Sequence, residues 1–175
     1  MASDSVMTAD IMKENVKTEI GLPDKSREGV VQILEALLCD EYVLYTKTRK
    51  YHWNVLGPSF HQLHIFLEKQ YEALDEIVDE VAERAREIGG KSLGTLAEFT
   101  RHARLSEDPG KYSDAQSMLS NLLKDHEAVI RNTRNDLDST DEKYHDMVTN
   151  NFLTALVQKH EKMAWMLRAH LEEKQ

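Results

Sequence analysis

Residues 52–68, HWNVLGPSFHQLHIFLE, contain the turn that decides the fold of this chain. The Gly-Pro pair at 57–58 ends a stretch, 30–56, that lacks Gly and Pro and places apolar residues at three- and four-residue steps. Directly after this pair, SFHQ at 59–62 has the pattern of a capping box, which starts a helix. We therefore predict two long helices, 30–56 and 59–88, that form an antiparallel hairpin around the turn.

The last part of the chain carries the same helix-start signature twice. SDAQ at 113–116 and STDE at 139–142 both have the capping-box pattern. They predict two further helices, roughly 114–137 and 140–173, joined by only a few polar residues. A second antiparallel hairpin follows, so we expect four long helices in all.

The link between the two hairpins determines the topology. It runs from Gly89 to Tyr112, which is long enough to cross the length of a bundle, and we expect a short extra helix at 93–105 within it. One long crossover between two hairpins is the ferritin-like arrangement rather than simple up-down-up-down order. We predict an all-α, ferritin-like four-helix bundle over residues 27–175, with the short extra helix in the crossover between helices two and three. Residues 1–26 lack a sustained periodicity and are predicted to be a flexible N-terminal tail.

Charge and cysteine content exclude several classes of protein. The chain of 175 residues has a net charge of −9, which argues against a surface built to neutralise nucleic-acid phosphates. Its single cysteine, Cys39, excludes an internal disulfide, fits a reducing compartment and has apolar neighbours that predict burial. No apolar run approaches the ~20 residues that span a bilayer, and the N-terminus lacks the apolar segment of a signal peptide. We therefore predict a cytoplasmic protein without membrane contact.

Four polar residues of the predicted helix 59–88 share one face. At about 100° per residue, Glu68, Asp79 and Glu83 lie about 40°, 60° and 100° around the helix from His64. Along the axis, however, His64 and Asp79 are about 22 Å apart. One metal ion cannot bind both pairs within a single helix.

The two pairs would meet if this helix packed antiparallel against its own copy. The His64/Glu68 pair of one chain would then face the Asp79/Glu83 pair of the other, about a two-fold axis near Ala73, whose small side chain favours close approach. Two-fold symmetry would create two identical sites at once.

The ligand types limit which metal such a site would take. His52, near the end of the preceding helix, can supply a second imidazole. Two histidines and three carboxylates suit iron, manganese or zinc rather than calcium or copper(I), and the absence of a thiolate argues against a closed structural zinc site. A polar stripe of this kind is also typical of a solvated helix face.

The other histidines lack paired carboxylates in a repeated geometry. His61 lies about 60° around the helix from His64 and is expected to be a pore or surface residue. Five more are expected at the surface or at polar interfaces: His102, His126, His145, His160 and His170. A Glu-x-x-His motif, which di-iron proteins use on each of two helices, occurs once, at 142–145, and is absent from helix 59–88. We therefore do not predict a di-iron site inside one bundle.

The segments KTRKYHWNVLGPSFHQLHIFLE and VDEVAERAREIGG closely resemble the Dps family, the DNA-binding proteins from starved cells, or mini-ferritins. The shared features are H-W-N-x-x-G, a second His twelve residues after the first, and a D-x-x-x-E-R segment that ends in Gly-Gly. HEKMAWMLRAHLEE is similar to the family's C-terminal region. The resemblance covers about residues 26–173.

This resemblance implies a ferroxidase centre shared between two subunits. His52, His64 and Glu68 would come from one subunit, and Asp79 and Glu83 from its two-fold mate, to hold iron, with zinc or manganese able to substitute. Position 68 is often Asp in the family, so the longer Glu arm changes the second metal position. Trp53, beside the centre, would be a redox-active neighbour; a large core aromatic is the alternative interpretation.

The resemblance also implies an assembly and an activity. The family forms a hollow homododecamer that oxidises Fe(II) to Fe(III), preferably with hydrogen peroxide or else with oxygen, and stores the ferric mineral inside. Removing Fe(II) and peroxide together protects DNA from oxidative damage.

Acidic residues near the start of the predicted helix 140–173 are candidates for lining an ion pore, as the family's three-fold pores are lined by acids from this region. These residues are Asp136, Asp138, Asp141, Glu142 and Asp146. A negative funnel would concentrate cations. Asn151 stands where relatives often carry a pore Asp, and a solvated acidic loop favoured by the helix dipole is the alternative.

DNA binding is the family feature with the least support. Relatives that bind DNA use Lys- and Arg-rich tails, whereas residues 1–26 carry Lys13, Lys17 and Lys25 against five acidic residues. We therefore expect weak or no DNA binding. The alternatives to a ferroxidase are a nucleoid-compacting DNA-binding protein with incidental iron binding, which the tail charge opposes, and an inert helical scaffold, which the shared stripe opposes.

Overall fold

The computed structural model describes residues 18–172, and within them it contains helices and no strand. The long helices are α2 (Asp24–Asn54), α3 (Phe60–Glu87), α5 (Ala115–Asp138) and α6 (Met147–Leu171). The short helix α4 (Leu96–His102) lies in the crossover, and a π-helical turn, η1 (Ser139–Lys143), follows α5. The predicted all-α bundle with a short extra helix is confirmed.

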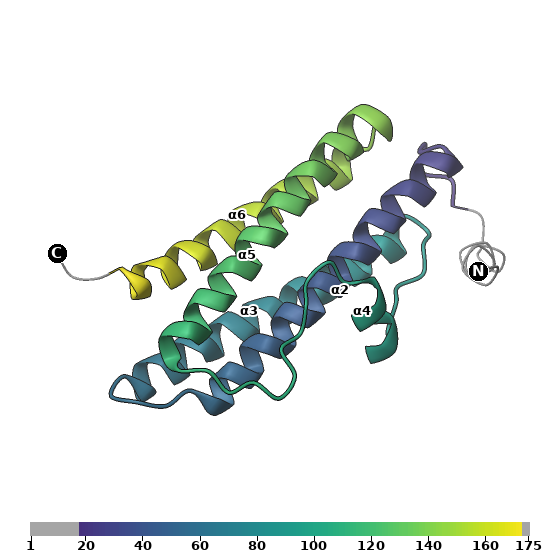
Figure 1. Ribbon diagram of the computed structural model, residues 1–175. Helices are drawn as coiled ribbons and strands as arrows, with labels where there is room; N and C mark the ends of the chain where they lie inside the picture. The colour runs from purple at the N-terminus through teal and green to yellow at the C-terminus, as the bar shows by residue number, and fades with distance from the viewer. Residues whose placement is uncertain (1–17, 173–175) are drawn as a thin grey trace.

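Two antiparallel hairpins pack into one bundle (Figure 1). One consists of α2 and α3, and the other of α5 and α6. The crossover returns along the bundle to the end at which α3 began, so that α5 runs in the same direction as α3 (Figure 1). This is the ferritin-like order.

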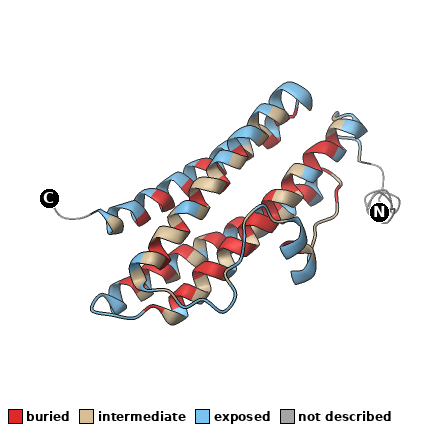
Figure 2. Ribbon diagram, in the orientation of Figure 1, coloured by how far each residue is buried: buried red, intermediate tan, exposed pale blue. Residues whose placement is uncertain are grey.

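The core lies between the two hairpins because each long helix carries an apolar face. Figure 2 shows the buried positions on the inward sides of the helices. Leu34, Leu44, Leu74, Ile77 and Leu153 are among the fully buried side chains. The predicted buried position of Cys39 is confirmed, since its side chain has no exposed surface. No helix among the described residues is both long enough and apolar enough to cross a bilayer.

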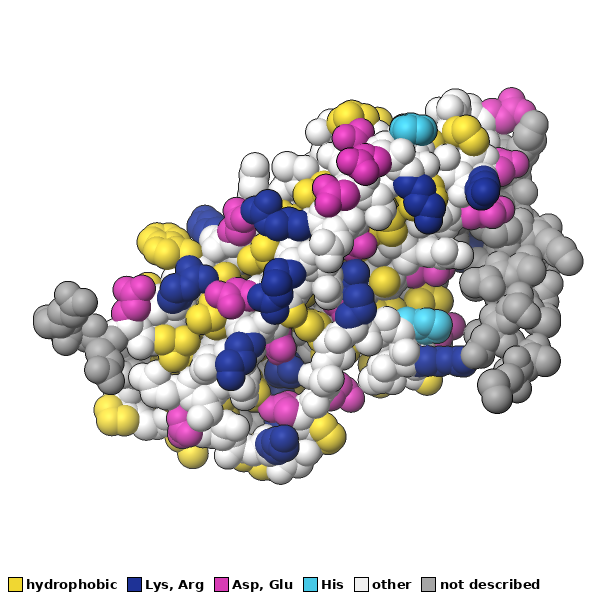
Figure 3. Space-filling view, turned by 45° about the horizontal axis from the view of Figure 1, so that its top comes forward, with side chains coloured by type: hydrophobic (Ala, Val, Ile, Leu, Met, Phe, Trp, Pro, Cys, Tyr) yellow, Lys and Arg dark blue, Asp and Glu magenta, His cyan; other side chains and the backbone are white. Residues whose placement is uncertain are grey.

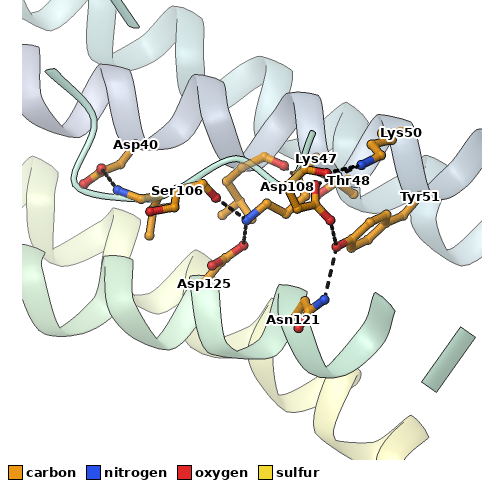
Figure 4. Close-up of polar contacts among 11 residues, drawn as sticks. Asp40, Lys47, Thr48, Lys50, Tyr51, Ser106, Asp108, Asn121 and Asp125 are labelled. Carbon is orange, nitrogen blue, oxygen red and sulfur yellow. Dashed lines mark hydrogen bonds and ion pairs between the residues drawn. The ribbon is translucent and has the colours of Figure 1, made fainter. Parts of the chain in front are cut away.

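Buried polar contacts fasten the crossover to α2 and α5 (Figure 4). The buried carboxylate of Asp40 accepts hydrogen bonds from the backbone N–H groups of Arg104 and Leu105, at 2.6 and 3.0 Å, and from Arg104 Nε at 2.7 Å. The Lys47 ammonium donates to the Ser106 carbonyl at 2.7 Å and to Asp125 at 2.6 Å. Hydrogen bonds to charged groups are worth roughly 1.5–3 kcal/mol each, so they hold the long link in a defined path.

Helix starts differ from the predicted capping boxes. Ser59 precedes α3 as predicted, but its backbone (φ −96°, ψ 18°) is not extended and its side chain makes no capping bond. Asp114 rather than Ser113 caps α5, by accepting from the N–H of Ser117 at 2.9 Å. A capping box that we did not predict joins Thr95 and Glu98 at the start of α4. In addition, α2 begins at Asp24, so 24–26 of the predicted tail are helical; most of that tail lies outside the described residues.

The predicted start of the last helix near 139–140 is wrong. The Ser139 hydroxyl donates back to the Asn135 carbonyl at 3.2 Å, so it extends the preceding helix instead of capping the next. The chain turns at His145, whose φ is 54°, and α6 begins only after Asp146. The Asp146 carboxylate caps it by accepting from the N–H of Thr149 at 3.0 Å.

Candidate metal centre

His52 and His64 form a reciprocal pair where α2 ends and α3 begins. His52 Nδ1 donates to the His64 carbonyl at 2.8 Å, and His64 Nδ1 donates to the His52 carbonyl at 2.9 Å. The two rings stack with centroids 3.8 Å apart and an angle of 21° between planes. Because a carbonyl only accepts, Nδ1 carries the hydrogen in both rings, and both Nε2 lone pairs remain free. Metal-binding histidines are typically held in this way.

The tight turn at residues 55–59 brings this pair together. It lets the last turn of α2 lie beside the first turns of α3, with the Val55 N–H bonded to the Tyr51 carbonyl at 2.8 Å. His52 is buried and His64 is half-buried. Both rings are thus fixed by backbone contacts, which removes most of their rotational freedom before any ligand binds.

Glu68, one turn beyond His64 on α3, is half-buried. It adds a carboxylate to the same side of the helix. The nearby Tyr71 ring meets the His52 ring edge-on, with centroids 5.2 Å apart. Burial first, and then the Glu68 charge, raise the pKa of Tyr71 above its ordinary value, so its hydroxyl keeps its proton at neutral pH.

Trp53 is 65% exposed, so its interpretation as a core aromatic is wrong. The Arg49 guanidinium lies 5.6 Å from the Trp53 ring and 4.9 Å from the Tyr71 ring. These cation–π distances place a permanent positive charge and an exposed indole beside the histidine pair.

Asp79 and Glu83 lie on the exposed surface of α3. Within residues 18–172 neither has an ion pair or a side-chain hydrogen bond. Helix geometry places Asp79 about 22 Å from His64 along the axis. The part of one subunit that the structure describes contains no group of three or more His, Cys, Asp or Glu side chains able to hold a metal ion.

The candidate pore residues differ in their surroundings. Asp138, Asp141 and Glu142 are exposed, in the last turn of α5 and in η1. Asp146 is buried, and its carboxylate is occupied in capping α6. Asp136 pairs with Arg104 at 3.0 Å.

His126 and His160 were expected at the surface or at polar interfaces; the surface alternative is wrong, and the two residues lie in a buried polar contact between helices. His126 is fully buried and His160 is 1% exposed. Their Nδ1 atoms are 3.0 Å apart, and His160 Nε2 is 2.8 Å from Oε1 of the fully buried Glu41. Each His occupies an apolar stripe of its helix, His126 between Leu122 and Val129, and this spacing is the sequence signal that indicates burial. The remaining expected surface histidines are exposed: His61, His102, His145 and His170.

Comparison with known proteins places this geometry in a family. Residues 31–175 match the model of the ferritin-like domain. The low temperature-induced protein of Nostoc sp. is 44% identical over 156 residues, which cover 89% of this chain and 87% of that protein. DNA protection during starvation protein 2 of Bacillus anthracis is 32% identical over 145 residues, which cover 82% of this chain and 97% of that protein.

Solved structures agree with these relatives. DpsC from Streptomyces coelicolor superposes with a TM-score of 0.88 at 30% identity, covering 92% of this chain and 94% of that one. A Dps protein from Vibrio cholerae, described as a member of a broad superfamily of ferritin-like diiron-carboxylate proteins, superposes with a TM-score of 0.83 at 27% identity, covering 89% and 97%. The four-helix bundle with its paired histidines therefore belongs to the Dps family of ferritin-like proteins.

Proposed function

We propose that this protein is a ferroxidase that oxidises Fe(II) to Fe(III) with hydrogen peroxide, or with oxygen, at centres shared between two subunits, and stores the ferric product in a hollow homododecamer. The observation that carries the proposal is the His52–His64 pair. Its two Nε2 atoms are free while both Nδ1 atoms are bonded. Neutral imidazole with its second nitrogen fixed is a good ligand for Fe(II).

The substrate site needs oxygen ligands as well. Glu68 contributes one carboxylate from the same subunit, and hard oxygen ligands favour Fe(III) once it has formed. Asp79 and Glu83, which have no ion pair or side-chain hydrogen bond within residues 18–172, are suited to complete the ligand set from a second subunit.

An antiparallel α3 pair would bring these groups together. A two-fold axis near Ala73 would place the histidine half of one subunit against the acidic half of the other, and it would do so twice. Leu56, Phe60 and Ile65, near the histidine half, are large apolar side chains that remain exposed in the single subunit. Such a patch on a soluble protein is typical of a surface that a partner covers.

Using peroxide at paired irons has a chemical advantage. Two Fe(II) ions supply both electrons that reduce one hydrogen peroxide to water, with two protons taken up and two Fe(III) ions formed. Because no single-electron step releases a hydroxyl radical, this reaction would protect DNA without contact. Asp138, Asp141 and Glu142 are exposed acids that could attract the incoming cations.

Direct DNA binding is not part of the proposal. The net charge is −9. On the face shown in Figure 3, Lys and Arg side chains are interspersed with Asp and Glu rather than gathered in one basic patch. Counterion release from DNA requires clustered positive charge.

A complementation experiment tests the shared centre. One variant carries His52→Ala and His64→Ala, and the other carries Asp79→Asn and Glu83→Gln. Each alone should lose Fe(II) oxidation with peroxide. After the two are unfolded together and reassembled in equal amounts, half of the two-fold dimers contain one subunit of each kind, and each of these has one intact site, so about a quarter of the wild-type rate should return. Absence of any recovery in correctly sized assemblies would show that the two halves do not act across a subunit boundary.

A further inference from the structure

Three buried titratable side chains form a row across the bundle, well away from the candidate metal centre. Glu41 comes from α2, His126 from α5 and His160 from α6. The row runs from Glu41 Oε1 to His160 Nε2, at 2.8 Å, and from His160 Nδ1 to His126 Nδ1, at 3.0 Å. Because Glu41 belongs to one hairpin and both histidines to the other, the row bridges the two hairpins.

Among the described residues, the two hairpins make most of their close contacts between α2 and α5. On the opposite side, α3 and α6 leave a cleft of about 430 Å³ between them, lined by residues that include Phe66, Ile77 and Met163. The α5–α6 hairpin is therefore held to the rest of the bundle mainly through α2.

The other buried charged groups around the row have ion-pair partners of their own. The buried residues of α3 include no charged side chain, Gln70 being a neutral amide. His126 is the buried titratable residue of α5 and His160 that of α6. Charged residues that adjoin Glu41, His126 or His160 in the sequence form ion pairs with other described residues: Asp40 with Arg104, Asp125 with Lys47, Glu127 with Arg168, Lys159 with Glu80 and Glu161 with Arg134.

The contact between the two histidines tolerates one proton and not two. Two Nδ1 atoms 3.0 Å apart form a hydrogen bond only when one carries a hydrogen and the other offers its lone pair. If both carried hydrogens, two N–H groups would point at each other. Two imidazolium charges at that separation repel strongly in a buried site, where water does not screen them.

We propose that Glu41, His160 and His126 form an acid-sensitive latch that holds the α5–α6 hairpin against α2 at neutral pH and releases it when both histidines are protonated to imidazolium. Release would loosen the interface between the hairpins while leaving each hairpin intact, because the turn at residues 55–59 and the junction at η1 contain none of the three residues.

The expected pH range follows from linkage. Burial first, and then the charge of His160, lower the pKa of His126 well below 6.5. In the unfolded chain this ring has the ordinary pKa of about 6.5. The native state therefore binds fewer protons than the unfolded state below that value, and the contribution of the latch to stability is lost as the pH falls below about 6.5.

The full-length protein with His126→Gln tests the latch. Glutamine keeps a neutral amide that can bond to His160 but does not titrate. The matched control is His102→Gln, which makes the same change at an exposed position on α4. The thermal unfolding midpoint is measured from about pH 7.5 to about pH 5, the range in which histidine titrates. On acidification, the unfolding midpoints of wild type and His102→Gln should decrease equally, and by several degrees more than the midpoint of His126→Gln. Equal decreases in all three proteins would overturn the proposal.

A measurement on the wild type avoids any folding defect of the variant. Hydrogen–deuterium exchange at the histidine C2 position, read by mass spectrometry, reports each ring separately. His126 and His160 should be protected at about pH 7.5 and lose that protection together as the pH approaches 5, while the exposed His102 should be unprotected throughout. Protection of both rings down to pH 5 would show that no latch opens. Neither readout depends on iron oxidation, so the experiments test the latch independently of the proposed ferroxidase activity.

Discussion

His52 and His64 each donate the Nδ1 hydrogen to the backbone carbonyl of the other, at 2.8 and 2.9 Å. The relationship is reciprocal, and each ring can turn only by breaking its own bond to the backbone of the other residue. It joins the end of α2 to the start of α3 and leaves two Nε2 lone pairs on one stacked pair of rings. The contact that joins the two helices therefore also positions the two candidate metal ligands.

Replacing His64 with Ala should slow Fe(II) oxidation with peroxide by at least about 10- to 100-fold, because it removes one ligand and also the ring that stacks on His52. Formation of Fe(III) is followed by absorbance. His61→Ala, on the same helix but exposed, is the control and should oxidise iron at the wild-type rate. Unchanged activity in His64→Ala would place the centre elsewhere.

Asp40→Asn should destabilise the protein by about 2–4 kcal/mol. The carboxylate is fully buried and accepts three hydrogen bonds from Arg104 and Leu105. An amide loses the charge that pairs with Arg104 and directs N–H groups at backbone donors. Urea unfolding measures the change. Asp75→Asn, at an exposed position of α3, should differ from wild type by less than about 0.5 kcal/mol.

Gly29→Ala should cost about 1–3 kcal/mol, although alanine is the better helix former. A Cβ atom at position 29 would overlap the Tyr144 ring, so this ring would have to leave its place against α2. Denaturant unfolding measures the loss, and combining the change with Tyr144→Leu should recover part of it. Gly94→Ala is the control, because a Cβ there meets nothing within 4 Å.

Cys39 should be nearly inert toward thiol reagents in the native protein. Burial, together with the neighbouring Asp40 and Glu35 charges, raises the pKa of its thiol to about 12, so its thiolate fraction falls by about 1,000-fold relative to an ordinary cysteine. A chromogenic disulfide reagent should label it slowly when native and at once in denaturant. Rapid labelling without denaturant would mean that α2 opens readily.

A gel-shift experiment with bare plasmid at neutral pH should show no stable complex at moderate salt, because the net charge of −9 repels the phosphates. Lysozyme serves as a basic positive control. A salt-sensitive shift would contradict the prediction and would support the nucleoid-compacting alternative.

Several features could be read directly from neighbouring residues. The Gly-Pro pair at 57–58 and the apolar stripes predict two hairpins, and the length of the 89–112 link predicts the crossover. The stripe of His64, Glu68, Asp79 and Glu83 on one side of α3 follows from helix periodicity alone, because an α-helix places residues on its surface by spacing and not by distant contacts. These are local properties, and the sequence determined them by itself.

Only the tertiary structure decided which distant groups meet. The stacking of His52 on His64 depends on how α3 docks against α2. The meeting of Glu41 with His126 and His160 requires three helices to come together around residues up to 119 positions apart in the sequence. The late start of α6 has the same origin, because Ser139 bonds back to Asn135 and Asp146 makes the cap instead. A capping motif has the same local sequence whether or not it starts a helix, and an isolated histidine has the same local sequence whether it is buried or exposed. Packing between helices decides which of these outcomes occurs.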